Sequence, residues 1–117
     1  MEDLKIRTGH LFNTHANQYK DWVIGSFVKD LDFKSDCFEF KYQKAKKGEK
    51  SESKVALEPN VKTLCILIYG EAILSFEGGT HLIYLRKEGD YAQYEPNEPH
   101  QVEFKEDSFI LTLRWKI

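Results

Sequence analysis

Residues 88–104 read EGDYAQYEPNEPHQVEF, and this stretch says more about the fold than any other part of the sequence. A Gly-Asp pair forms a turn ahead of a short alternating strand, and Pro96 and Pro99 then reverse the chain. His100 opens the next alternating strand. This order predicts a β-hairpin in a small β-barrel, with one imidazole at the barrel mouth.

The size and charge of the chain point to one ordinary globular domain. Its 117 residues suit a single core, and 41% hydrophobic with 31% charged residues is a common composition. The 17 basic and 19 acidic residues are mixed along the sequence, so no face for nucleic acid or an anionic membrane is indicated. The longest apolar run, residues 64–69, is far too short to cross a bilayer. We therefore expect neither nucleic acid nor a membrane as a partner.

The N-terminus and the cysteine content both bear on the compartment of the protein. Nothing near Met1 resembles the apolar part of a signal peptide, so we expect a cytoplasmic protein. Cys37 and Cys65 are the only cysteines, fewer than a disulfide-stapled secreted domain usually carries. Neither has a base or cation beside it in the sequence, so we expect two buried structural thiols.

Strands are expected through most of the chain, because aromatic and β-branched residues alternate with polar ones at a period of two. Segment 44–53 (KAKKGEKSES) is almost free of apolar residues, and we expect a mobile surface loop there. Gly78 and Gly79 are expected to form a two-residue hairpin loop, whereas residues 1–20 are of uncertain structure. The other expected strands cover residues 22–28, 38–43, 63–69, 71–77, 80–86 and 109–116.

The order from Gly89 to His100, together with the apolar strand that ends at Gly70, resembles the two short motifs of the cupin superfamily. The resemblance covers about residues 54–115 and includes a closing Leu-Arg-Trp similar to that of small stand-alone cupins of unassigned function. It implies an all-β, cupin-type double-stranded β-helix (jelly-roll) barrel as a single domain over residues 1–117. It also implies a homodimer, for which strand 22–28 is the expected contact.

The sequence departs from the metal-binding members of that superfamily. They carry two histidines and a carboxylate or glutamine upstream of the glycine that matches Gly70, but residues 54–63 contain no histidine. Glu58 is the only carboxylate there, and a metal cage needs three or four converging ligands. No cofactor is therefore expected, although a divalent metal at His100 is left open. His10, His15 and His81 are too scattered to predict a rebuilt metal site.

His100 has two interpretations. It is either a pocket histidine that contacts a ligand or acts as a base, or a rim residue bonded to the backbone. If the interior is open, Tyr91 and Gln93 are expected to line it with His100, and Glu58 is a further ligand-binding candidate. Arg114 alternates with Thr112, so we expect it on the outward polar face, with Leu111, Leu113 and Trp115 packing inward.

Three functions remain from the sequence. The first is a cupin-like protein without the usual metal cage that binds a small polar molecule, such as a sugar or carboxylate. The second is an enzyme, either metal-dependent or an acid-base isomerase, in which Tyr91, Tyr84 or Glu58 assists His100. The third is an oligomerisation module whose barrel is filled by its own side chains.

Overall fold

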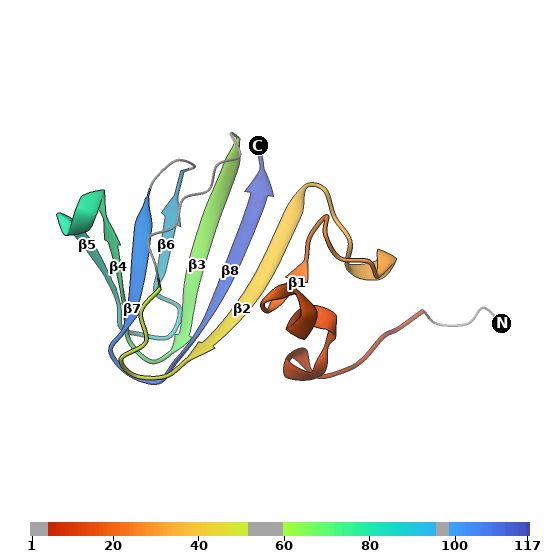
Figure 1. Ribbon diagram of the computed structural model, residues 1–117, viewed down its shortest axis with the longest axis horizontal. Coiled ribbons are helices and arrows are strands. Elements are labelled where there is room, and N and C mark those ends of the chain that lie inside the picture. The colour runs from red at the N-terminus through yellow and green to blue at the C-terminus, as the bar shows by residue number, and fades with distance from the viewer. Residues whose placement is uncertain (1–4, 52–59, 96–98) are drawn as a thin grey trace.

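Eight strands and four short 3-10 helices form the chain across residues 5–51, 60–95 and 99–117, which the computed structural model describes (Figure 1). The strands are β1 (Trp22–Ile24), β2 (Phe38–Ala45), β3 (Val61–Tyr69), β4 (Ala72–Phe76), β5 (His81–Leu85), β6 (Tyr91–Tyr94), β7 (His100–Phe104) and β8 (Ser108–Lys116). The helices are η1 (Leu11–Asn13), η2 (His15–Tyr19), η3 (Leu31–Phe33) and η4 (Glu77–Gly79). No described helix is long and apolar enough to cross a membrane.

The strands pair in two antiparallel sheets. The larger sheet has the order β1-β2-β8-β3-β6, and the smaller sheet has the order β5-β4-β7. Strands β6, β7 and β8 follow one another in the sequence but alternate between the sheets, so the chain crosses from one sheet to the other. Figure 1 shows the smaller sheet beside the β6 end of the larger one. The all-β prediction is confirmed.

The main hydrophobic core lies between the two sheets. Buried side chains alternate along β3, as expected for a strand with one face inward. Burial of apolar surface between the inner faces of the two sheets stabilises the fold. The buried residues of this core are Ala45, Cys65, Leu67, Ala72, Leu74, Leu85, Phe104 and Ile110.

A second apolar cluster covers the outer face of β2 and β8. Tyr42 is buried there beside Ala16 of η2. The ring centroid of Phe12 lies 5.1 Å from that of Tyr42 and 5.7 Å from that of Phe109. The N-terminal segment, which the sequence left unassigned, therefore packs against the larger sheet and shields part of its outer face from water.

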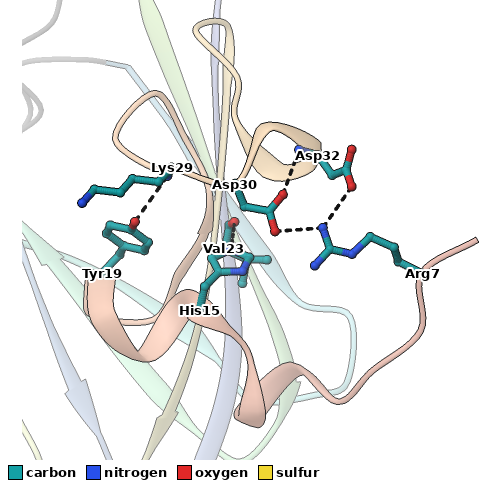
Figure 2. Close-up of polar contacts among 7 residues, drawn as sticks. All are labelled: Arg7, His15, Tyr19, Val23, Lys29, Asp30 and Asp32. Atoms are coloured by element: carbon teal, nitrogen blue, oxygen red, sulfur yellow. Dashed lines mark hydrogen bonds and ion pairs between the residues drawn. The ribbon is translucent and has the colours of Figure 1, made fainter.

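Polar contacts join the N-terminal segment to β1 and to the loop after it (Figure 2). Arg7 Nη1 lies 2.8 Å from Asp30 Oδ2 and 3.0 Å from Asp32 Oδ2, and His15 Nε2 lies 2.8 Å from the Val23 carbonyl oxygen. The ion pairs of Arg7 are solvent-exposed and contribute little to stability, so the aromatic packing is the stronger anchor.

Two expected segments differ from the structure. The strand expected at residues 22–28 ends at Ile24, because the register with β2 shifts after Trp22 and the chain then leaves the sheet. Gly78 and Gly79 belong to η4, and Phe76 pairs with His81, so four residues rather than two connect β4 and β5.

The segment expected as a mobile loop, residues 44–53, is bonded to β7 as far as Ser51. Lys44 and Ala45 still belong to β2. Beyond them, the amide of Gly48 donates to the Phe104 carbonyl at 2.8 Å, and the amide of Ser51 donates to the Val102 carbonyl at 2.9 Å. Polar composition did not prevent ordering, because backbone groups rather than side chains hold this segment to an open sheet edge. Residues 52 and 53 lie outside the described part.

Gly70 permits a close approach between two turns. Its φ is +100°, and a Cβ at this position would meet the Ser108 side chain and the backbone of Asp107. Ser108 is fully buried; its Oγ accepts a hydrogen bond from the Glu71 amide at 3.1 Å and donates to the Glu106 carbonyl at 2.7 Å. The expected bend at Gly70 is confirmed, and it closes the apolar end of the core.

Substitution of Gly70 by alanine is expected to lower the free energy of unfolding by about 3 kcal/mol. About 1 kcal/mol comes from the left-handed backbone, and about 2 kcal/mol comes from crowding against Ser108. Gly48→Ala is the matched control, since Gly48 has a φ of +92° but no neighbour within 4 Å. Urea unfolding monitored by circular dichroism measures both variants; equal losses would show that the contact with Ser108 is not restrictive.

Candidate functional site

The register of the larger sheet brings four polar side chains into one row across its inner face. Arg114 of β8 is the direct partner of Glu39 on β2 and of Thr63 on β3. Thr63 is in turn the partner of Tyr94 on β6. Direct partners in an antiparallel sheet have Cβ atoms about 4.5–5.5 Å apart, so these side chains are neighbours despite their distance in sequence.

The inner face changes from polar to apolar along the strands. Two residues further along, the row contains Lys41, Thr112 and Cys65. The following row pairs Gln43 with Ile110, which in turn pairs with Leu67. One end of the interior is therefore rich in hydrogen-bonding groups, and the other end is the closed hydrophobic core.

The polar end contains a cavity of about 190 Å³. The smaller sheet closes its opposite wall with Leu74, Val102 and His100, and Trp22 of β1 and Ser51 lie at its margin. The remaining described lining residues come from the larger sheet and are Lys41, Gln43, Thr63, Cys65, Tyr94, Ile110, Thr112 and Arg114.

His100 and Tyr94 form a hydrogen-bonded pair in the wall of this cavity. Tyr94 Oη lies 3.3 Å from His100 Nε2, and Phe76 packs against both rings. Burial is the main cause that raises the pKa of Tyr94 above its ordinary value, so its hydroxyl is protonated at neutral pH. A protonated phenol beside an imidazole can donate or relay a proton, with the direction set by the histidine tautomer.

Arg114 is held between a carboxylate and an indole. Its Nη1 lies 3.4 Å from Glu39 Oε1, and its Cζ lies 5.8 Å from the centroid of the Trp22 ring. The same ring has Lys41 Nζ at 5.6 Å. Two cations therefore share one aromatic surface at the cavity margin, an arrangement stabilised by the ring quadrupole.

The facing expected for β8 is wrong. Thr112 and Arg114 line the cavity, whereas Leu111 packs in the outer cluster with Phe109. The alternation of polar and apolar residues along β8 was predicted correctly, but the polar face of the strand points inward. The cause is the N-terminal segment, which covers the outer face of β8 and makes that face apolar.

The expected lining by Tyr91 and Gln93 is also corrected. Both lie on the outer side of β6 and border a shallow groove, where Tyr91 is 66% exposed. The alternate residue Tyr94 faces the cavity and is the tyrosine that the sequence analysis did not select. Tyr84, which was expected as a possible assistant to His100, is exposed and does not line the cavity. Glu58 lies outside the described residues.

The described lining does not fit a divalent metal. His100 is its one imidazole, and no described aspartate or glutamate lines the cavity. Lys41 and Arg114 would repel a dication. His10 accepts a hydrogen bond from the Phe12 amide and His81 is exposed at the start of β5, and neither lines this cavity. Nowhere in the described residues do three histidine, cysteine or carboxylate side chains gather as a metal site would require.

Comparisons with known proteins agree with this architecture. No family model and no curated protein matches the sequence. Among solved structures, a cupin-2 domain protein from Shewanella frigidimarina aligns with a TM-score of 0.56 and 16% identity over 68% of this chain and 71% of that one. KdgF from a Halomonas species aligns with a TM-score of 0.60 and 15% identity over 71% and 72%.

A third similar structure is an oxalate decarboxylase variant from Bacillus subtilis, with a TM-score of 0.59 and 20% identity over 70% of this chain and 22% of that one. The chain has the cupin fold. The predicted jelly roll is thus confirmed, and His100 stands at the start of β7 on the inner wall of the cupin barrel. Identities this low establish the fold and leave the chemistry to the residues.

The two cysteines of this cupin barrel have opposite environments. Cys65 is 3% exposed, and burial raises its pKa to about 11 despite a hydrogen bond with Thr112. Cys37 is exposed, contrary to expectation, because it precedes β2 instead of lying within it. At neutral pH the thiol in the cavity wall is protonated and is a poor nucleophile.

We expect one fast thiol per chain with Ellman's reagent at pH 8. Cys37 supplies it, and the Cys37→Ser variant should show no fast phase. Cys65 should react only after unfolding in guanidinium chloride, because the folded protein keeps it buried and protonated. Two fast thiols in the native protein would contradict the burial of Cys65.

Proposed function

We propose that this protein binds a small polar organic molecule, such as a sugar or a carboxylate, in the cavity at the polar end of its barrel. The supporting observation is the register row that brings Arg114, Thr63 and Tyr94 together on the inner face. Hydroxyl, amide and cationic groups turned away from water need polar partners, and a bound polar molecule supplies them. The cavity of about 190 Å³ is smaller than the ~300–1,000 Å³ of sites for drug-sized ligands, so the ligand is small.

A filled barrel would make the protein a purely structural module. The cavity argues against this, because a volume of about 190 Å³ is left unfilled between the two sheets. We further propose that the ligand binds without a metal ion, because the described lining contains one imidazole and two cationic side chains.

The Thr112→Met variant tests the proposal by filling the cavity. A panel of small carboxylates and monosaccharides is screened by thermal shift and ligand-observed NMR. At least one compound should bind the wild type, and the variant should bind it at least tenfold more weakly because the longer side chain occupies its space. Thr80→Met, in the exposed turn before β5, is the control and should bind as the wild type does. Binding that survives Thr112→Met would place the ligand elsewhere.

Elemental analysis addresses the metal. Untagged wild type and the His100→Ala variant should both lack stoichiometric Fe, Mn, Ni and Zn. Tight metal in the wild type that is lost in His100→Ala would overturn the metal-free proposal.

An acid-base enzyme is the second candidate, and the contact between Tyr94 and His100 favours it. A bound substrate with an acidic C–H bond would face both a proton donor and a base. Solved structures similar to this chain include proteins named as a DMSP lyase and an oxalate decarboxylase, which supports an enzymatic candidate.

Deuterium exchange distinguishes the enzyme from the binding protein. A compound found to bind is incubated with the protein in D₂O, and its C–H signals are followed by proton NMR. An enzyme should exchange a C–H proton, with a loss of at least a hundredfold in Tyr94→Phe and His100→Gln while binding persists. A bound compound that keeps all its C–H signals would remove the enzymatic candidate and leave the binding function intact.

A further inference from the structure

We infer that the ligand of the inner cavity is a small carboxylate and that Arg114 binds its charged group. This inference rests on the proposed function and narrows it to one ligand class. The charges of the cavity are the first argument: Lys41 and Arg114 line it, and no described carboxylate does. Because Arg114 brings a guanidinium into this lining, the cavity favours an anion over a neutral sugar.

The hydrogen bonds of Arg114 are the second argument. Its one ionic contact in the described structure is with Glu39, and 3.4 Å is longer than the ~2.7–2.9 Å of a charge-assisted hydrogen bond. No described residue accepts a hydrogen bond from its guanidinium, and the side chain is only 21% exposed. A carboxylate entering the cavity would therefore meet parallel N–H donors, the geometry that a guanidinium binds in a bidentate manner.

Glu39 and Trp22 fix the orientation of the guanidinium. Glu39 lies beside Arg114 across the strand pair but does not line the cavity, so it attracts the guanidinium without occupying the ligand space. The centroid of the Trp22 ring lies 5.8 Å from Cζ, so the ring covers part of the same group, whose side chain is 21% exposed. An ion pair with a ligand is stronger where water is excluded, and a preorganised guanidinium loses little freedom on binding.

The rest of the lining suits the body of a small hydroxy or keto acid. Thr63 is the direct neighbour of Arg114, and Tyr94 is the next residue along the row. From Arg114, a carboxylate would direct its α-substituent toward these hydroxyl groups. The apolar floor of Leu74, Val102 and Ile110 would accept a short carbon chain.

Fluorine NMR tests the charge of the ligand with two matched probes. Trifluoroacetate and 2,2,2-trifluoroethanol carry the same trifluoromethyl group, but only the first is an anion. With wild-type protein, the trifluoroacetate signal should broaden and acetate should reverse this, whereas trifluoroethanol should bind at least tenfold more weakly. Equal binding of the neutral probe would overturn the assignment of a carboxylate ligand. Displacement of trifluoroacetate by glucose, galactose or mannose rather than by acetate would also overturn it.

Arginine variants locate the anion. Arg114→Gln should weaken trifluoroacetate binding at least tenfold, and Arg114→Lys should give an intermediate loss, because lysine keeps the charge but not the planar fork. The matched control is Arg86→Gln, since Arg86 is an exposed arginine paired with Glu71. If Arg114→Gln does not fold, as judged by circular dichroism, Arg114→Lys alone decides. Unchanged binding in the Arg114 variants, or an equal loss in Arg86→Gln, would overturn the assignment.

The outcomes separate this inference from the function on which it rests. One outcome is that a neutral compound binds, that Thr112→Met prevents this binding and that Arg114→Gln does not. The cavity would then bind small molecules, but the assignment of a carboxylate ligand would be wrong. If no compound binds in a manner that Thr112→Met blocks, the proposed function itself fails. If inorganic phosphate displaces trifluoroacetate at least tenfold better than acetate, the site is for phosphate and the carboxylate is overturned.

Discussion

The antiparallel register of β2, β8, β3 and β6 is the constraint on which the candidate site depends. Backbone hydrogen bonds fix which residues are opposite one another, and a shift of one residue would turn every side chain to the other face. In this register Arg114 lies between Glu39 and Thr63, with Tyr94 one strand further on. The site is thus a consequence of strand pairing, and Arg114 lies in the two longest ladders of the fold, β2 with β8 and β3 with β8.

In this barrel one end of the inner face is polar and the outer face of β2 and β8 is apolar, the reverse of the usual distribution. The N-terminal segment makes this possible because it covers the apolar outer face. The outer face of β2 and β8 is apolar and would be exposed without cover. Phe12 and Ala16 pack on it, so burial of apolar surface stabilises the fold outside the barrel as well as within it. The inner face near Arg114 is then free to remain polar, while Leu67, Leu74 and Phe104 fill the other end.

The sequence predicted the architecture well but the site only in part. One physical reason explains the difference. Periodicity of two identifies a strand and its two faces, but it does not say which face is inward. The alternation identifies Glu39, Lys41 and Gln43 as one face of β2, and Thr112 with Arg114 as one face of β8. The usual rule that polar faces point to solvent then predicted an outward direction for Arg114, whereas Thr112 and Arg114 line the cavity. The aromatic residues of the first twenty positions were the available signal, since they need an apolar surface to cover. The same ambiguity led to the choice of Tyr91 instead of Tyr94.

His100 illustrates what a motif can and cannot specify. The alternating strand that His100 opens is local in the sequence and is confirmed as β7, with His100 on the inner wall, whereas residues 96–98 of the expected proline corner lie outside the described part. Its chemistry depends on neighbours from other strands: Tyr94 within hydrogen-bond distance, Phe76 against its ring, and two cations across the cavity. In a cage of carboxylates and imidazoles a histidine at this point would bind a metal. If the cavity binds a carboxylate as proposed, His100 would lie across from the guanidinium, where the natural roles of an imidazole are hydrogen bonding and proton transfer.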